Sequence, residues 1–164
     1  IYQRKVKDMI QWLAYTTQII YPDNIGSAEI KGIENNLTLK YKFLYYTNSI
    51  TYMKTLNKSA VVNGLNKELP AKPKFDFSNE LGFDSINLGL KIFANFNYTG
   101  ESFADLDNRY KNADKKNINL GVVYYKNKLS AALELKNITD ELNQDVYGFP
   151  LPGRAYYSKL NYNF

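Results

Sequence analysis

The sequence of 164 residues contains no cysteine and no histidine. Without cysteine there is no disulfide framework and no thiol nucleophile. Without either residue there is no cysteine/histidine zinc site, no haem held by histidine and no catalytic triad that needs an imidazole base. Ordinary hydrolase chemistry would have to rest on carboxylates, lysine or tyrosine.

Long apolar runs are also missing. The longest uncharged stretch, residues 9–22, is interrupted by glutamine, threonine and tyrosine, whereas a helix that spans a bilayer needs about 20 apolar residues. A transmembrane β-barrel stays possible, because its strands need only about 9–11 alternating residues each. Residues 1–8 are charged and show no signal peptide, and we interpret the start without Met as a cut from a longer protein.

The net charge of +5 makes nucleic acid or an anionic surface a partner to consider. However, acidic residues stand among the basic ones, as in Lys5, Lys7 and Asp8. Scattered charges of both signs are typical of a solvated surface. We therefore expect no nucleic-acid partner.

Aromatic residues are abundant, with 15 Tyr, 9 Phe and 1 Trp, and they favour strands. Apolar and polar residues alternate with period two in several segments, which indicates strands with one face of each kind. We expect strands at residues 1–13, 28–41, 47–56, 74–83, 88–98, 118–125, 129–136 and 156–164. The first of these alternates poorly.

The connections between these strands alternate between short and long. Short ones fall near residues 43–46, 84–87 and 126–127, and long ones cover residues 14–27, 57–72, 100–116 and 137–153. Tight turns at one end and long loops at the other are typical of an outer-membrane barrel. Aromatic residues near the strand ends fit an interfacial girdle (Tyr41, Phe83, Tyr98, Tyr124, Tyr162 and Phe164).

The faces opposite the apolar ones are polar and carry glycine, as in a polar barrel lumen. Their members are Glu34, Lys40, Asp76, Glu80, Lys91, Glu134 and Lys159, with Gly82, Gly89 and Gly121. The pattern therefore predicts an all-β fold, a transmembrane antiparallel β-barrel.

Four segments, in order along the chain, resemble TonB-dependent outer-membrane receptors. They are RKVKDMIQW (residues 4–12), NIGSAEIKGIE (24–34), LPAKPKFDFSNELGF (69–83) and the C-terminal KNITDELNQDVYGFPLPGRAYYSKLNYNF from residue 136. In the last segment, Asn137 to Asp140 resembles the end of the family's penultimate strand. Pro152, Gly153 and Arg154 resemble the start of its last strand.

The resemblance implies that residues 1–164 are the C-terminal part of a receptor barrel, about the last eight strands of a 22-stranded plugged barrel, with the plug domain absent from this chain. It implies a protein of the bacterial outer membrane, in contact with its lipid, and a transporter rather than an enzyme. The receptor would import a scarce small-molecule chelate or cofactor, a siderophore or cobalamin. Its partners would be the rest of the barrel, the plug and, through the plug, the TonB–ExbB–ExbD energy-coupling complex. No cofactor and no metal site of its own are expected.

Ligand contacts would come from aromatic and amide side chains of the long loops. The candidates are Trp12, Tyr15, Tyr21, Asn24, Phe103, Tyr110, Tyr147 and Phe149. For each, loop packing or interfacial anchoring is the plain alternative. The residues Asp105, Asp107 and Asn108 resemble part of a calcium loop, but the closing glutamate is absent, so a solvated acidic loop is favoured.

Four residues near the C-terminus are expected to serve structure and assembly. Gly153 would supply an unusual backbone angle, and Arg154 would pair with a lumen acid such as Glu134. The aromatic strand with Tyr162 and Phe164 resembles the signal that the outer-membrane assembly machinery reads.

Two other readings of the same pattern remain open. A self-contained eight-stranded barrel could act as a structural anchor or adhesin, which requires residues 1–13 to pair with the C-terminal strand. A soluble β-sandwich that binds nucleic acid through its positive charge is the third reading.

Overall fold

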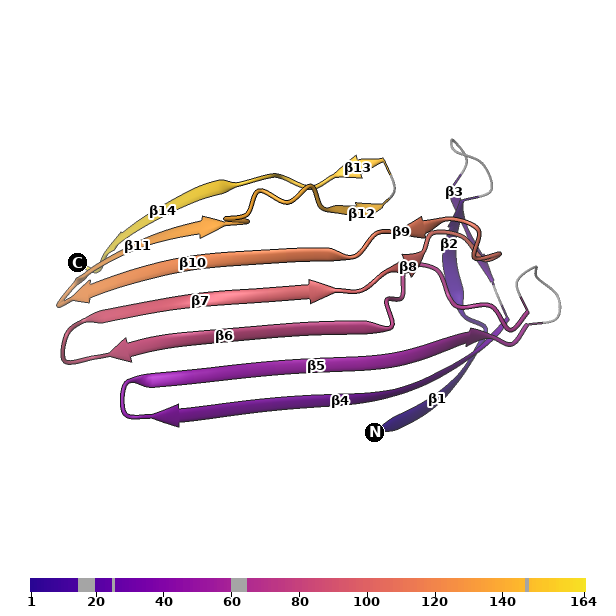
Figure 1. Ribbon diagram of the computed structural model, residues 1–164, viewed down its shortest axis with the longest axis horizontal. Coiled ribbons are helices and arrows are strands. Elements are labelled where there is room, and N and C mark those ends of the chain that lie inside the picture. The colour runs from indigo at the N-terminus through magenta and orange to yellow at the C-terminus, as the bar shows by residue number, and fades with distance from the viewer. Residues whose placement is uncertain (15–19, 25, 60–64, 147) are drawn as a thin grey trace.

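An antiparallel sheet of eight strands dominates the computed structural model, which describes residues 1–14, 20–24, 26–59, 65–146 and 148–164 (Figure 1). The strand order is β1-β4-β5-β6-β7-β10-β11-β14. Its strands are β1 (Tyr2–Lys7), β4 (Ser27–Tyr41), β5 (Leu44–Asn57), β6 (Phe75–Ser85), β7 (Leu90–Thr99), β10 (Lys115–Lys126), β11 (Leu129–Lys136) and β14 (Ala155–Tyr162). This confirms the all-β class and the approximate strand positions.

Three small hairpins stand beside the sheet. They pair β2 (Ile10–Ala14) with β3 (Ile20–Asn24), β8 (Ser102–Phe103) with β9 (Lys111–Asn112), and β12 (Gln144–Val146) with β13 (Phe149–Pro150). The single strand expected over residues 1–13 is therefore wrong. The chain leaves the sheet at Asp8, whose φ of 53° breaks the extended backbone, and β2 pairs with β3 outside the sheet.

The two ends of the sheet differ as the sequence predicts. Tight turns join β4 to β5, β6 to β7 and β10 to β11 at one end, and the long connections with the three hairpins lie at the other (Figure 1). The turn after β6 lies slightly later than expected, because Leu88 and Gly89 belong to it and Gly89 has a φ of 61°. Gly89 is therefore a turn residue rather than a member of the polar face.

Aromatic rings cover the two remaining glycines of the polar face. A Cβ atom at Gly82 would lie 2.2 Å from the Tyr45 ring, and one at Gly121 would lie 2.2 Å from the Phe93 ring. The Lys91 ammonium lies 5.2 Å from the Tyr45 ring centre and 5.4 Å from the Phe93 ring centre. Each glycine thus makes room for a ring from the neighbouring strand.

The apolar face carries aromatic clusters at both ends. Phe43 and Phe83 lie 5.8 Å apart beside the tight turns. Toward the long connections, Phe75 contacts both Phe77, at 6.2 Å, and Tyr98, at 6.0 Å. Aromatic clusters toward both ends of the apolar face are typical of a membrane-facing barrel wall.

Buried apolar residues are few, and they lie at the end with the long connections. Among the described residues, Ala28 and Leu69 form the buried apolar cluster, against which Met9 and Leu106 pack. The large apolar side chains of the sheet stay exposed, for example Leu81 at 59% and Leu133 at 61%. Such exposure on a soluble domain would be costly, so the sheet face needs an apolar surrounding.

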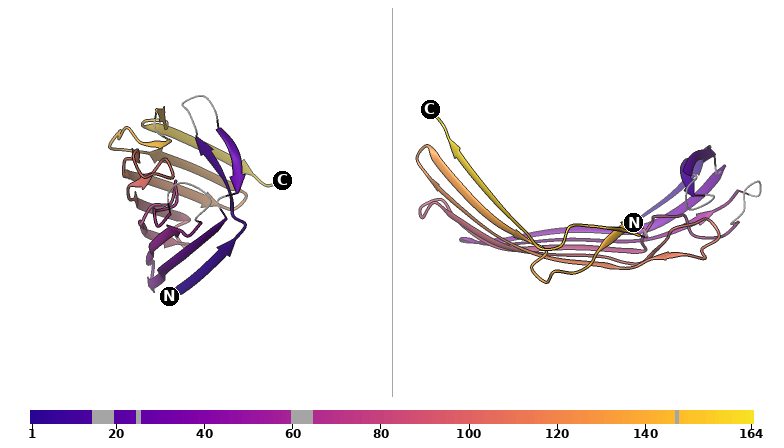
Figure 2. Two further views of the ribbon diagram at one scale, coloured as in Figure 1. Left: turned by 90° about the vertical axis from the view of Figure 1, so that its right-hand side faces the viewer. Right: turned by 90° about the horizontal axis from the view of Figure 1, so that it is seen from above.

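The sheet is curved and open (Figure 2). In the described part of the chain, β1 and β14 are its two edges and do not pair with each other. The self-contained eight-stranded barrel required that pairing, and the sandwich required a second packed sheet, so neither alternative matches this fold. Among the described residues, no helix is long and apolar enough to cross a membrane.

Candidate functional site

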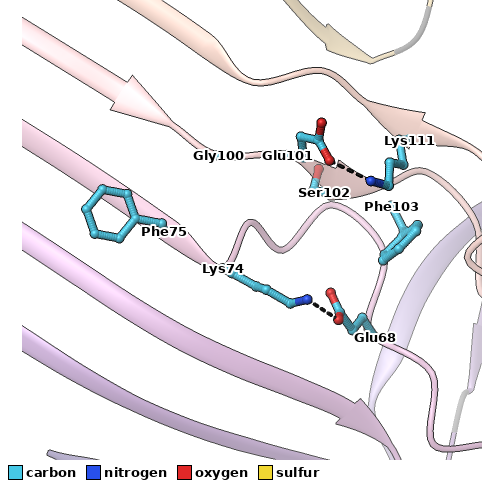
Figure 3. Close-up of a pocket in the computed structure, with 8 residues that line it drawn as sticks. All are labelled: Glu68, Lys74, Phe75, Gly100, Glu101, Ser102, Phe103 and Lys111. Carbon is cyan, nitrogen blue, oxygen red and sulfur yellow. Dashed lines mark hydrogen bonds and ion pairs between the residues drawn. The ribbon is translucent and has the colours of Figure 1, made fainter.

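A pocket of about 290 Å³ lies where the long connections meet the ends of β6 and β7 (Figure 3). Two segments supply its walls, the connection that leads into β6 and the one that follows β7. The lining residues are Glu68, Lys74, Phe75, Gly100, Glu101, Ser102, Phe103 and Lys111. The pocket therefore combines aromatic rings with charges of both signs.

Two ion pairs flank the pocket (Figure 3). Lys74 Nζ lies 2.5 Å from Glu68 Oε1, and Lys111 Nζ lies 2.7 Å from Glu101 Oε2. The lysine side chains are 51% and 58% exposed. Since exposed pairs contribute little to stability, their chief effect is to place four charges around one opening.

Backbone hydrogen bonds hold the two walls together. The amide of Gly100 donates to the Phe75 carbonyl at 2.8 Å, and that of Ala71 donates to the Phe103 carbonyl at 2.8 Å. Asn108 bridges both connections, because its Oδ1 accepts from the Glu68 amide at 2.8 Å and its Nδ2 donates to the Glu68 carbonyl at 3.0 Å. The pocket is thus preformed rather than a gap between free loops.

Lys111 and Phe103 bring a positive charge and an aromatic ring close together in the pocket. The hydrogen bond to Glu101 raises the pKa of Lys111 above its ordinary value, so its ammonium stays charged at neutral pH. That ammonium also lies 6.0 Å from the Phe103 ring centre. Lysine ammonium groups attract carboxylates or phenolates, and an aromatic ring offers a stacking surface.

The candidate ligand residues do not gather at one place. Phe103 lines the pocket, and Tyr110 lies 66% exposed on the same connection. Phe149 is 71% exposed in β13, and Asn24, at the end of β3, accepts a hydrogen bond from the Gly26 amide at 2.7 Å. Trp12 and Tyr21 lie on β2 and β3, but their side chains, like the whole of Tyr15 and Tyr147, fall outside the described residues.

The charged residues of the pocket were missed by the sequence analysis. Glu68, Lys74, Glu101 and Lys111 look like ordinary solvated loop charges in the sequence. One signal could have singled out Lys74, which directly precedes the start of β6. The other three residues reach the pocket through contacts between connections that are far apart in the sequence.

The acidic loop beside the pocket has a structural role. Asp105 Oδ1 accepts hydrogen bonds from the amides of Arg109 and Tyr110, each at 2.9 Å, and Asp107 pairs with Arg109. Among the described residues, no group of acidic side chains could hold a metal ion.

The two C-terminal motifs contact each other directly. Asp140 Oδ1 accepts a hydrogen bond from the Arg154 amide at 2.7 Å, and a Cβ atom at Gly153 would lie 2.7 Å from the same oxygen. The expected reason for glycine is therefore wrong, since Gly153 is absent from the positive-φ residues and is needed for close approach. Glu134 forms an ion pair with Lys136 at 2.9 Å, in place of the expected pairing with Arg154.

A curved antiparallel sheet with tight turns at one end, long connections at the other and an exposed apolar face defines the wall of a membrane β-barrel. The model of the family described as TonB dependent receptor-like, beta-barrel, matches residues 1–138. The chain belongs to this family. It is therefore part of a bacterial outer-membrane receptor, and the expected family, fold and location are confirmed.

Solved receptors have the same fold. BauA, the ferric preacinetobactin receptor from Acinetobacter baumannii, is 14% identical with a TM-score of 0.75. The match covers 99% of this chain and 26% of BauA. A mutant of the ferric enterobactin receptor PfeA from Pseudomonas aeruginosa is 19% identical with a TM-score of 0.72. The match covers 99% of this chain and 28% of PfeA. The copper transporter OprC is 16% identical with a TM-score of 0.73, at 99% and 27% coverage. The chain thus spans about a quarter of the length of these structures.

Proposed function

We propose that the receptor to which this sheet belongs binds a scarce metal chelate at the outer face of the membrane and imports it. In this proposal the sheet is the C-terminal part of a 22-stranded barrel, completed by further strands and filled by a plug. Energy for release would reach the plug from the TonB–ExbB–ExbD complex. No covalent chemistry on the ligand is needed.

The preformed pocket at the end with the long connections is the observation that carries this proposal. Its two lysines and Phe103 offer the charges and the ring that an anionic aryl chelate would contact. Its volume of about 290 Å³ is at the lower limit for small-molecule pockets. It would therefore hold one arm of a ligand, with the plug and the other strands contacting the rest.

A ferric siderophore is the ligand class that we favour. Two of the solved structures with this fold are named as the ferric enterobactin receptor and the ferric preacinetobactin receptor. Acidic oxygen donors of such a ligand would compete with Glu68 and Glu101 for the ammonium groups of Lys74 and Lys111. Cobalamin is the second candidate, on the likeness of residues 147–154 to the vitamin B12 receptor type. A copper transporter has the same fold, so the fold alone does not determine the ligand.

Uptake of radiolabelled iron by cells that carry the full-length receptor as their sole siderophore receptor tests the function. We expect import with one or more ferric siderophores, abolished when TonB is deleted. Import of labelled cobalamin alone would favour the second candidate, and import of neither would contradict the proposal.

Lys111→Gln tests whether the pocket contributes to binding. It removes the charge beside Phe103 and should weaken ligand binding about 3- to 10-fold, the loss of one exposed ionic contact of about 1 kcal/mol. Lys72→Gln is the matched control, because Lys72 is an exposed lysine of the connection into β6 that does not line the pocket. Equal affinity of the two variants would exclude the pocket as a ligand contact.

A further inference from the structure

The end of the sheet with the tight turns carries most of the net charge. This end comprises residues 42–43, 84–91, 123–132 and 159–164, from the ladder row of Asp84 and Lys91 to the turns. Five lysines stand there against one acidic residue, Asp84, which gives +4 of the chain's +5. The lysines are Lys42, Lys91, Lys126, Lys128 and Lys159.

These lysines have no ion-pair partner. Every ion pair in the described part of the chain lies outside this end, for example that of Lys136 with Glu134. Asp84 instead accepts a hydrogen bond from the Tyr125 hydroxyl at 2.8 Å. The tight-turn end therefore attracts anions from outside the protein.

Two of the five lysines, Lys126 and Lys128, lie beside aromatic rings on the lipid-facing side. Lys126 belongs to the apolar face, because it shares a ladder row with Leu129 and Tyr162. Lys128 lies in the turn that follows, and the Tyr162 and Phe164 rings lie 5.2 Å apart. Aromatic side chains in such a place mark the headgroup level of a bilayer, and long lysine side chains extend to it.

An apolar groove of about 750 Å³ crosses the same face farther from the turns. Its lining on β6, β7 and β10 includes Leu81, Phe83, Ile92, Ala94, Leu120 and Val122. Ala94 pairs with Leu81 on one side and with Leu120 on the other, so its methyl group leaves a hollow between two larger side chains. Gly82 also lines the groove, whereas Tyr45, which covers Gly82 on the polar face, does not. The groove therefore opens on the lipid-facing side.

The groove lies one acyl chain away from the two lysines. Gly121, which lines the groove, is five residues from Lys126 on β10, which is about 17 Å along the strand. With a strand tilt of roughly 35–45°, this is about 13 Å along the membrane normal, or half of an apolar band about 25 Å tall. A lipid with its headgroup at Lys126 can thus reach the groove with one chain.

We propose that the receptor holds an anionic phospholipid here, with its phosphate on Lys126 and Lys128 and an acyl chain in the groove. The short turns of outer-membrane barrels lie on the periplasmic side, where the leaflet consists of phospholipids. A phosphate accepts charge-assisted hydrogen bonds from both ammonium groups. An anionic headgroup is favoured over a zwitterionic one, because the protein offers these lysines no carboxylate.

Native mass spectrometry of the delipidated full-length receptor in detergent tests the headgroup site. Titrations with dioleoyl-phosphatidylglycerol and with dioleoyl-phosphatidylethanolamine compare an anionic and a zwitterionic headgroup on the same chains. We expect tighter binding of phosphatidylglycerol. Lys126→Gln/Lys128→Gln should weaken that binding about 10- to 30-fold, because two charges near the membrane surface are lost.

Lys91→Gln/Lys159→Gln is the matched control. It removes the same charge at the same end, but from the polar face of the sheet, and should leave the affinity for phosphatidylglycerol unchanged. Lys126→Arg/Lys128→Arg keeps both charges and should bind like the unaltered receptor. Equal affinity of the unaltered receptor for the two lipids overturns the proposal, as does an equal loss in the two glutamine variants.

Ala94→Leu tests the place of the acyl chain. It fills the hollow between Leu81 and Leu120 and should weaken binding of dioleoyl-phosphatidylglycerol about 4- to 15-fold, the equivalent of one or two methylene groups kept out of the groove. Dihexanoyl-phosphatidylglycerol, whose chains are too short to reach the groove from Lys126, should bind the variant and the unaltered receptor alike. Normal heat-modifiable migration on gels verifies that each variant barrel has folded, and Ala94→Val takes the place of a variant that has not. Undiminished binding of the dioleoyl lipid to the folded variant overturns the role of the groove.

Discussion

Replacing Gly82 by alanine tests how the polar face of the sheet is filled. The new Cβ would lie 2.2 Å from the Tyr45 ring, and ordinary contact begins at 3.4 Å, so the ring must retreat by at least about 1.2 Å. That movement breaks the hydrogen bond from Tyr45 Oη to Glu80 Oε1, now 2.6 Å long. Overpacking costs about 1–3 kcal/mol and the loss of a bond to a charged acceptor about 1.5–3 kcal/mol. We expect a loss of about 3 kcal/mol in the free energy of unfolding.

A double-mutant cycle separates this cause from a general intolerance of side chains at the position. Once Tyr45→Ala has removed the ring, Gly82→Ala should cost less than about 0.5 kcal/mol, because nothing is left for its methyl group to displace. The assay is denaturant unfolding of the full-length receptor in detergent micelles, followed by fluorescence. Equal costs of Gly82→Ala in both backgrounds would refute the reasoning. Gly121 and Phe93 form a second such pair, for which we expect a smaller coupling, since Phe93 has no hydroxyl.

Three further predictions concern other parts of the chain. Asp140→Ala should lower the free energy of unfolding by about 1–3 kcal/mol through loss of the bond to the Arg154 amide, whereas Asp140→Asn keeps an acceptor and should stay near wild type; unfolding midpoints of the two variants decide this. Glu101 raises the pKa of Lys111 above its ordinary value of 10.5, so the Lys111 ammonium stays charged up to that pH and loses its proton only as the pH rises through the higher folded value. Ligand affinity measured against pH should therefore show no step from Lys111 near neutral pH, and such a step would contradict the assignment. Deletion of Phe164 should reduce the amount of full-length receptor assembled in the outer membrane, and normal levels on immunoblots would contradict this.

The sheet was predictable because each strand has two different faces. Alternation places residues 129–136 in a strand, and the structure has β11 over Leu129–Lys136. Leu88 shows a limit of the alternation pattern. It fits the apolar positions of the following strand in the sequence, yet it lies in the turn before that strand and is 64% exposed. Asp8 shows another, because a single residue with positive φ ends β1 and leaves no signal in the alternation.

The pocket was predictable only in its location. Long connections at one end of the sheet are evident from the strand spacing, and Phe103 was a candidate. The opposing wall depends on Asn108, which hydrogen-bonds to Glu68 across 40 positions of the sequence. No local pattern contains such a contact. Glu68 and Glu101 can be recognised as pocket residues only once the fold has placed Lys74 and Lys111 beside them.

The connection between β11 and β14 is fastened near its base. Asp140 holds the Arg154 amide, and Asn143 exchanges two hydrogen bonds with the backbone of Lys116, at 3.2 and 2.8 Å. The β12–β13 hairpin extends beyond these fastenings (Figure 1). Selection or an engineer can therefore lengthen, shorten or exchange the hairpin without shifting the register of β11 against β14. The barrel wall keeps its pairing while the hairpin changes.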